Sequence, residues 1–300
     1  MAEAHLMRPR HLALAVAVAA IWGFNFVAID AGLDHFPPLL FSALRFGLAA
    51  FPAILFAGRP QVPWRWVVAV ALVLGVTKFS LLFAGMAAGM PAGLSSLVLQ
   101  SQAIFTMLFA VLLLRERPRR VQIAGLAVAV AGVLLVATRM GANLAAFLLV
   151  VGAAVAWGLS NVATRKASPP DSLRFMVWVS ALATGPLIVL SLVVDGFEQD
   201  LAALRTVDTE AVLSLLYIAL ISTLAGFAGW GFLLRTYGAA TVAPFSMLVP
   251  FFGMASASLL LREPLHLVDV IGGALVVGGV LLGLVRGRPA VSRRLARVEV

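Results

Sequence analysis

Lys78 stands within the apolar stretch VLGVTKFSLLF, and no other charged residue occurs between Arg65 and Arg115. In the middle of a membrane span, a lysine costs about 2.5–3.5 kcal/mol on insertion scales, so it must face a cavity or a polar partner. Together with the adjacent Phe79, it could dock a carboxylate in an apolar cavity. Alternatively, it bonds to helix carbonyls or extends to a span end. Because both predicted ends are distant, we expect the cavity.

Aromatic and polar side chains recur together at two places, each time at positions i, i+3 and i+4 of a predicted helix, which share one face. Such a face suits the wall of a cavity for an apolar solute that forms hydrogen bonds. It equally suits helix packing, in which a Trp-Gly pair fits against a neighbouring helix and Asn bonds to its backbone. The sequence leaves both interpretations open. The two sets are Trp22, Asn25 and Phe26, and Trp157, Ser160 and Asn161.

Two further polar features occur within apolar stretches. Ser95, Gln102 and Thr106 fall within a narrow angular range of one helix at about 100° per residue. A polar stripe facing lipid would be unfavourable, so we expect it to face the interior and meet water, substrate or another helix. Arg45 lies about two turns into another apolar span, and we interpret it as a structural anchor near a helix end.

The residues that an enzyme would need are missing. The four histidines lie in termini, loops or span ends, and the sequence has no paired intramembrane carboxylates, His-Glu metal motif or phosphate-binding loop. It also lacks cysteine, which excludes a thiol nucleophile or thiolate metal site. An intramembrane enzyme is therefore an unfavoured alternative, and we expect neither a cofactor nor a bound metal.

The composition is that of a membrane protein. Hydrophobic residues make up 62% of the 300 residues and charged residues 12%, with a mean hydropathy of +1.04, whereas a soluble domain has about 25% charged residues. The net charge of +9 is spread between apolar runs rather than gathered in one stripe. Phospholipid headgroups, and not nucleic acid, are therefore the expected neighbours. The chain is predicted to be an all-α polytopic membrane protein.

Charges, prolines and glycines divide the chain into ten apolar spans, close to the ~20 residues that cross a bilayer as a helix. Ten spans place both termini on one side. If that side is the cytoplasm, 17 of the 22 lysines and arginines lie inside and only Arg139, Arg205 and Arg262 outside, a strong positive-inside bias. The predicted spans are residues 11–30, 38–57, 66–87, 91–114, 121–138, 144–164, 172–194, 211–234, 240–261 and 267–285.

Three phrases of the sequence recur in the same order. AIWGFNFVA, LRF and LLLRE in the first half return as VAWGLSNVA, LRF and LLLRE in the second. With five spans in each copy, the second copy enters the membrane from the opposite side. We therefore expect two inverted five-helix repeats, residues 1–141 and 142–300, the second ending in a basic cytoplasmic tail. Inverted repeats are typical of secondary transporters, whose site lies between the repeats near the midplane.

The stretches WGFNFVAIDAGL, LRFGLAA and LLLRERPRRVQIAGLAVAVAGVLLV, each with its second-half counterpart, resemble the EamA modules of the drug/metabolite transporter superfamily. The resemblance covers nearly the whole chain. It implies a ten-helix exporter in which helices 1–4 and 6–9 surround a central cavity and helices 5 and 10 are peripheral. By general similarity, without a diagnostic motif, the chain most resembles bacterial inner-membrane exporters of amino acids, and among these the aromatic amino acid exporters.

We expect an inner-membrane transporter, with both termini cytoplasmic, that exports small amphipathic metabolites by alternating access, above all aromatic or hydrophobic amino acids. All 13 acidic residues lie in tails, loops or span boundaries, whereas proton-driven carriers commonly use a buried carboxylate relay. Facilitated efflux is therefore expected, with proton antiport through Lys78 as the lesser option.

The alternative transport function is exchange of anionic metabolites or nucleotide sugars, for which a phosphate would require a second strongly basic cavity position that the sequence does not clearly place. The expected partners are a small-molecule substrate and membrane lipid, with the chain a monomer or weak dimer. The substrate-binding candidates are Lys78, Trp22, Asn25, Phe26, Phe79, Ser95, Gln102, Trp157, Ser160 and Asn161.

Overall fold

The computed structural model describes residues 7–51 and 53–284, and all regular secondary structure in these ranges is helical. Eight helices are long and apolar enough to cross a membrane, and two shorter apolar helices, Pro38–Ala50 and Leu267–Gly283, accompany them. The prediction of an all-helical membrane protein is therefore confirmed. The expected basic tail, residues 286–300, lies outside the described residues.

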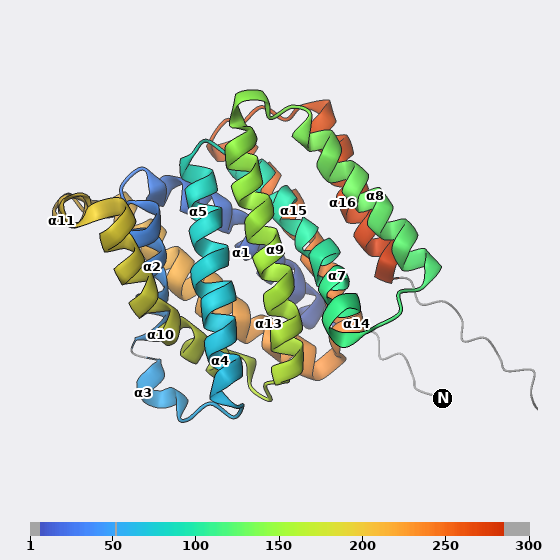
Figure 1. Cartoon of the computed structure of the whole chain (residues 1–300), viewed down its shortest axis with the longest axis horizontal. Coiled ribbons are helices and arrows are strands. Elements are labelled where there is room, and N and C mark those ends of the chain that lie inside the picture. Colours follow the sequence, from blue (N-terminus) through green and yellow to red (C-terminus); the bar gives the residue numbers. More distant parts are fainter. Residues whose placement is uncertain (1–6, 52, 285–300) are drawn as a thin grey trace, which may run out of the picture.

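The helices follow one another along the chain with short connections (Figure 1). Three π-helical stretches, Ala71–Lys78, Leu192–Gly196 and Tyr217–Ala225, join α4 to α5, α10 to α11 and α12 to α13. The bounds are α1 (Pro9–Leu33), α2 (Pro38–Ala50), α3 (Ile54–Ala57), α4 (Trp64–Val70), α5 (Phe79–Ala87), α6 (Ala92–Val98), α7 (Gln102–Leu114), α8 (Arg120–Ala137), α9 (Leu144–Ala167), α10 (Ser172–Ser191), α11 (Phe197–Arg205), α12 (Thr209–Leu216), α13 (Gly226–Tyr237), α14 (Ala239–Val242), α15 (Val249–Leu260) and α16 (Leu267–Leu284).

Most helix boundaries agree closely with the predicted spans, but two differ. The second span was predicted to reach residue 57, whereas α2 ends at Ala50 and Phe51 is extended. Phe51 precedes a proline in the sequence, and the residue before a proline is disfavoured in the helical conformation. The seventh span was predicted to end at residue 194, whereas the helical path continues into α11, turning at Gly196, whose φ is +94°.

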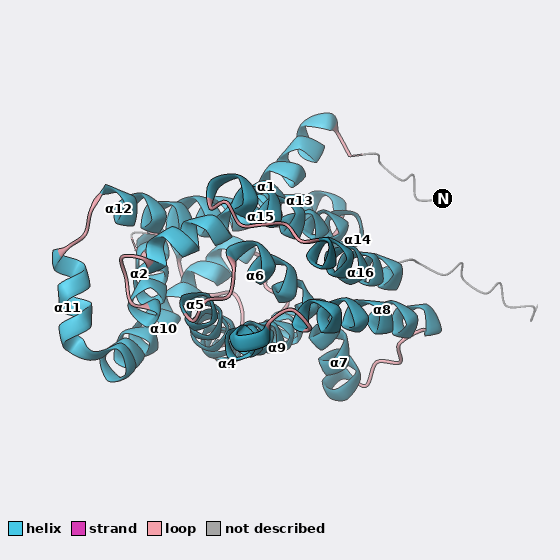
Figure 2. Ribbon diagram, turned by 90° about the horizontal axis from the view of Figure 1, so that it is seen from above, coloured by secondary structure: helices cyan, strands magenta, loops and turns pink. Residues whose placement is uncertain are grey.

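Four main contacts hold the bundle together: α1 packs on α15, α9 on α7, α10 on α2, and α16 on α8 (Figures 1 and 2). Each contact joins a helix from the first half of the chain to one from the second. The core is thus shared between the halves.

The glycines of the two Trp-Gly pairs allow two of these contacts. Gly23 of α1 lies directly against Phe252 of α15, and a Cβ atom at Gly158 of α9 would come within 2.6 Å of Phe105 Cβ on α7. A larger residue at either glycine would separate the helices. For these glycines, the helix-packing interpretation is therefore right.

Glycines also line the contact between α8 and α16. A Cβ atom at Gly125 or Gly132 would meet the backbone of α16 at Gly279 and Gly272, respectively. The two backbones are therefore in direct contact along this edge of the bundle, as small residues allow in membranes. Figure 2 shows the two helices side by side.

The two copies of LLLRE form the same kind of helix end. Arg115 and Arg262 adopt left-handed backbone conformations, with φ of 55° and 57°. In each copy the next residue, Glu116 or Glu263, donates its backbone N–H across the helix end to the carbonyl of an alanine at 3.3 Å. This is the hydrogen-bond pattern of a helix that ends in a left-handed residue. The repeated phrase therefore encodes a repeated helix terminus.

Candidate functional site

Two buried cations meet at one aromatic ring in the middle of the bundle. The Lys78 Nζ atom lies 3.4 Å from the centroid of Phe79, and the Arg45 Cζ atom lies 4.3 Å from the same centroid. Lys78 is only 6% exposed and Arg45 4%. Trp157 of α9 completes the group, with its ring 5.0 Å from Lys78 Nζ. We call Arg45, Lys78, Phe79, Trp157 and the Thr223 described below the central cluster.

The central cluster has an unbalanced charge. Among the described residues, no carboxylate forms a salt bridge with Lys78 or Arg45. Aromatic faces within about 6 Å attract a cation, but by only about 0.5–2 kcal/mol, whereas an unpaired buried charge costs several kcal/mol. The arrangement is therefore suited to an anionic group supplied from outside the chain.

Thr223 holds Arg45 in place across the interface between α2 and the α12–α13 helix pair. The Arg45 Nε and Nη2 atoms donate to Thr223 Oγ at 3.3 and 3.1 Å. Thr223 Oγ donates in turn to the carbonyl of Ile218, five residues earlier, at 2.7 Å. This bond belongs to the π-helical stretch Tyr217–Ala225, and such wide turns are frequent at functional sites.

The π-helical stretch that carries Lys78 has the same internal bond. Thr77 Oγ donates to the carbonyl of Leu72, again five residues earlier, at 3.0 Å. Thr77 is exposed, however, whereas Thr223 is buried against Arg45. Thus the π-helical stretch Ala71–Lys78 carries one cation, Lys78, itself. The π-helical stretch Tyr217–Ala225 orients the other cation, Arg45, through Thr223.

The first predicted aromatic and amide set is divided between packing and the site. The Trp22 indole N–H donates to the carbonyl of Ser222 at 3.0 Å, which fixes α1 against the residue before Thr223. Phe26 is buried in the hydrophobic core. Asn25 is also buried, but its Oδ1 atom has no hydrogen-bond partner within residues 7–51 and 53–284. Asn25 therefore keeps an acceptor available for a ligand.

In the second predicted set, Asn161 contacts the polar side chains of α7. The second set does not line a common cavity wall with the first set. Asn161 Nδ2 donates to Gln102 Oε1 at 2.6 Å and to Thr106 Oγ at 3.0 Å. Ser160 Oγ donates to the carbonyl of Trp157 in its own helix. These polar groups satisfy one another between α7 and α9, so helix packing explains them without a ligand.

Ser95 lies apart from both groups, at the start of the fourth predicted span. It is fully buried in α6, and its hydroxyl has no partner among the described residues. No described contact joins it to the central cluster.

The sequence analysis did not place Arg45 or Thr223 among the candidate site residues. Arg45 was interpreted as an anchor near a helix end, whereas it is the eighth of the thirteen residues of α2 and is buried. Span assignment extended this helix to residue 57 and could not show which helix Arg45 faces. The stretches VTK and STL around Thr77 and Thr223 share only the threonine, so the sequence carried no signal for this pair.

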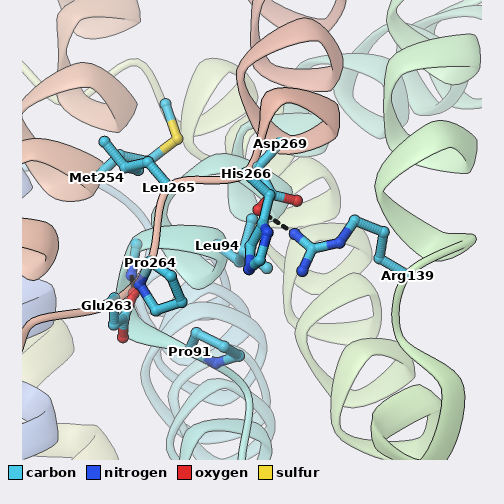
Figure 3. Close-up of a pocket in the computed structure, with 10 residues that line it drawn as sticks. Pro91, Leu94, Arg139, Met254, Glu263, Pro264, Leu265, His266 and Asp269 are labelled. Atoms are coloured by element: carbon cyan, nitrogen blue, oxygen red, sulfur yellow. Dashed lines mark hydrogen bonds and ion pairs between the residues drawn. The ribbon is translucent and has the colours of Figure 1, made fainter.

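A separate cavity of about 150 Å³ lies at one end of the bundle, between α6, α8, α15 and α16 (Figure 3). Arg139 forms an ion pair with the buried Asp269 beside it. Glu263 also lines it, and its carboxylate accepts hydrogen bonds from the backbone N–H groups of Ala92 at 2.6 Å and Gly93 at 3.0 Å. None of the lining residues belongs to the central cluster.

A second carboxylate binds a helix start in the same way. Asp195 Oδ2 accepts from the backbone N–H groups of Leu39 at 3.0 Å and Leu40 at 3.3 Å, in the first turn of α2. The first N–H groups of a helix lack partners within the helix, and negative charge is favourable there. Thus Asp195 and Glu263, both from the second half, each close the start of a first-half helix.

The sequence profile of the EamA-like transporter family matches residues 10–138 and 144–285 of the chain. A protein of Salmonella typhimurium named "Probable amino-acid metabolite efflux pump" is 41% identical over 95% of this chain and 97% of that protein. An Escherichia coli K12 protein with the same name is 39% identical over 93% and 97%. A solved crystal structure that is 20% identical covers 92% of this chain and 96% of its own, with a TM-score of 0.61, and so shares the fold.

Proposed function

Since the chain belongs to the EamA-like transporter family of the drug/metabolite transporter superfamily, we propose that it exports amino acids or closely related metabolites, with aromatic or large apolar side chains preferred. The observation that carries this proposal is the pair of buried cations around Phe79, which no carboxylate of the described residues balances. The names of the Salmonella and Escherichia relatives, which mention amino-acid metabolite efflux, agree with it.

In this proposal, the substrate carboxylate binds Lys78, and its apolar side chain packs against the rings of Phe79 and Trp157. A charge-assisted hydrogen bond in a site of low dielectric is strong and directional. The rings supply apolar area for the substrate side chain. The chain's own residues thereby complement both ends of an amphipathic solute.

We propose that the ten predicted spans form two inverted five-helix repeats, residues 1–141 and 142–300. Four observations support this assignment. The contact of α1 with α15 has its counterpart in the contact of α9 with α7, while α2 contacts its own counterpart α10 and α8 contacts its own counterpart α16. A two-fold relation between the halves requires this pattern. Thr77 and Thr223 make equivalent bonds within two wide turns, and Arg115 and Arg262 end equivalent helices. The family profile also matches the chain twice.

We propose transport by alternating access, with the described state closed on the outer side. Glu263 and Asp195 each fasten a second-half segment onto the start of a first-half helix. Such a capping bond is worth about 0.5–2 kcal/mol. Two of them are enough to bias an equilibrium between two conformations several-fold.

Glu116, which has the position of Glu263 in the first copy of LLLRE, makes a different contact. When the LLLRE phrases are aligned, Glu116 corresponds to Glu263, and the start of α14 at Ala239 corresponds to that of α6 at Ala92. Glu116 is exposed and binds Arg165 at 2.5 Å instead of the start of α14. In the opposite state, we expect Glu116 to leave Arg165 and cap the start of α14, while Glu263 releases α6.

We propose a location in the bacterial inner membrane with both termini in the cytoplasm, on the basis of the positive-inside bias of the loops. The chain is expected to act as a monomer or weak dimer. The glycine faces of α8 and α16, which would suit a dimer contact, pack against each other within the chain.

A panel of substrates in proteoliposomes tests the function. Uptake of labelled phenylalanine, threonine and a nucleotide sugar should show phenylalanine moving fastest. Counterflow without an imposed pH gradient should occur, because we propose facilitated efflux and not proton antiport. If counterflow needs a pH gradient, the coupling assignment is wrong.

A second candidate function is exchange of anionic metabolites or nucleotide sugars. It is favoured by one observation, the second buried cation, Arg45, beside Lys78. Two cations suit the doubly charged phosphate better than a single carboxylate. If only the nucleotide sugar moves in the same panel, this candidate replaces the amino acid proposal.

A further inference from the structure

Arg45 has hydrogen-bonding capacity that the protein does not use. A guanidinium group carries five N–H donors in a fixed plane. Two of its nitrogens, Nε and Nη2, donate to Thr223 Oγ, whereas Nη1 is buried and has no partner in the part of the chain that the structure describes. A buried charged donor without an acceptor is strongly unfavourable. The unused Nη1 edge therefore points to an acceptor that is not part of the described chain.

Thr223 and Phe79 fix the orientation of the Arg45 guanidinium group. Thr223 Oγ gives its own hydrogen to the Ile218 carbonyl at 2.7 Å, so only its lone pairs can face Arg45. The Phe79 ring covers the guanidinium at 4.3 Å from Cζ, and its centroid also lies 3.4 Å from Lys78 Nζ. An anion at Nη1 would thus meet a pre-oriented donor near a second cation, and a planar carboxylate fits the guanidinium edge.

Asn25 supplies the complementary group. Its Oδ1 atom is buried and accepts no hydrogen bond from any described residue, so it is an unused acceptor. Asn25 lies one turn beyond Trp22, which binds the Ser222 carbonyl at 3.0 Å, and Ser222 precedes Thr223. The unused donor thus belongs to α2 and the unused acceptor to α1, and both of these helices pack on the π-helical stretch Tyr217–Ala225.

We propose that Arg45 is a substrate-binding residue that, together with Lys78, holds the α-carboxylate, while Asn25 Oδ1 accepts from the α-ammonium group. This inference rests on the proposed function and specifies the substrate class as free α-amino acids recognised at both charged groups. Thr223 is then a positioning residue that acts only through Arg45. Analogues that lack either charged group should bind more weakly, because one buried partner stays unsatisfied.

Binding assays on purified full-length protein test this assignment. Labelled phenylalanine is displaced with phenylalanine, 3-phenylpropionate, which lacks the ammonium group, or phenethylamine, which lacks the carboxylate. In Arg45→Gln, the affinity for phenylalanine and 3-phenylpropionate should fall about tenfold or more, while that for phenethylamine should stay within about twofold. In Asn25→Leu, phenylalanine and phenethylamine should weaken and 3-phenylpropionate should not.

A matched pair of threonine variants separates positioning from general structure. Thr223→Val removes the acceptor for Arg45 and should weaken the two carboxylates but not phenethylamine. Thr236→Val removes a bond from a threonine hydroxyl to the carbonyl of Phe232 at 2.8 Å, at an exposed position of α13 outside the central cluster, and should leave all three affinities unchanged. Because valine is close to threonine in size, this pair is informative even if Arg45→Gln fails to fold.

The outcomes are distinct. If Arg45→Gln and Thr223→Val bind all three compounds as the wild type does, or weaken all three equally, Arg45 does not read the carboxylate and this inference is wrong. If the wild-type protein binds none of the three compounds, the proposed function is wrong and the assignment falls with it.

Discussion

The carboxylate of Glu263 accepts hydrogen bonds from the backbone N–H groups of Ala92 and Gly93, so the loop before α16 is fastened to the first turn of α6. This contact crosses from one half of the chain to the other beside the cavity of Figure 3. The two segments that it links must separate if the outer side opens. Mutation of Glu263 therefore tests whether this contact stabilises the closed state.

Glu263→Gln and Glu116→Gln should shift the conformational equilibrium in opposite directions. A single cysteine at Leu94, which is buried beside the cavity, can be introduced without background because the chain has no cysteine. Its labelling by an impermeant thiol reagent should be several-fold faster in Glu263→Gln, since the cap is weakened by about 1 kcal/mol. It should be slower in Glu116→Gln, because the lost cap of α14 in the open state outweighs the lost pair with Arg165, an exposed ion pair that contributes only about 0–1 kcal/mol.

The control for this pair is Glu198→Gln, since Glu198 is exposed on α11. It should leave the labelling rate unchanged. Equal shifts of the same sign in Glu263→Gln and Glu116→Gln would refute the exchange of caps.

Lys78→Ala should lose at least tenfold in apparent affinity for phenylalanine, because a charge-assisted hydrogen bond of about 1.5–3 kcal/mol is removed. The measurement is the concentration dependence of uptake into proteoliposomes. Lys166→Ala is the matched control, since Lys166 is exposed in the last turn of α9. Unchanged uptake by Lys78→Ala would exclude Lys78 from the substrate site.

Gly158→Ala should lower the stability of the protein by about 1–3 kcal/mol. The added methyl group would lie 2.6 Å from Phe105 Cβ, so α7 and α9 must move apart. Thermal unfolding in detergent measures the effect. Gly278→Ala is the control, because no atom of the described residues lies within 4 Å of its added methyl group. Equal stability of the two variants would mean that the Trp-Gly glycine does not set the helix contact.

Single cysteines should establish the orientation in the membrane. A cysteine at Phe197, which is exposed at the start of α11, should react with an impermeant reagent added outside intact cells. A cysteine at the exposed Ser168 should react only after the membrane is permeabilised. The reverse pattern would place both termini outside.

Hydropathy and charge predicted the helices well because lipid imposes long apolar segments. They failed where a polar helix continues beyond the apolar segment. Residues 197–205 contain three charges and were assigned to a loop, but they form α11. Mean hydropathy cannot distinguish a short polar helix from a loop.

The candidate site was only partly predictable. Lys78 stood out because a lone charge in an apolar span needs a partner. Trp22 and Asn161 were identified by their spacing, but spacing does not show which neighbour a side chain meets. Trp22 binds a backbone carbonyl, and Asn161 binds Gln102. Arg45 depends on Thr223, 178 residues away in the sequence, and only the folded chain brings these two together.

The glycine contact between α8 and α16 has a mechanical consequence. Where two backbones touch, no layer of side chains can absorb a small displacement by changing rotamers, so movement of one helix is passed directly to the other. One helix comes from each half, and the contact lies at the edge of the bundle away from α2, α10 and α11 (Figures 1 and 2). The two halves are therefore expected to rock about this edge as a fixed hinge line, with the widest excursion at the far side.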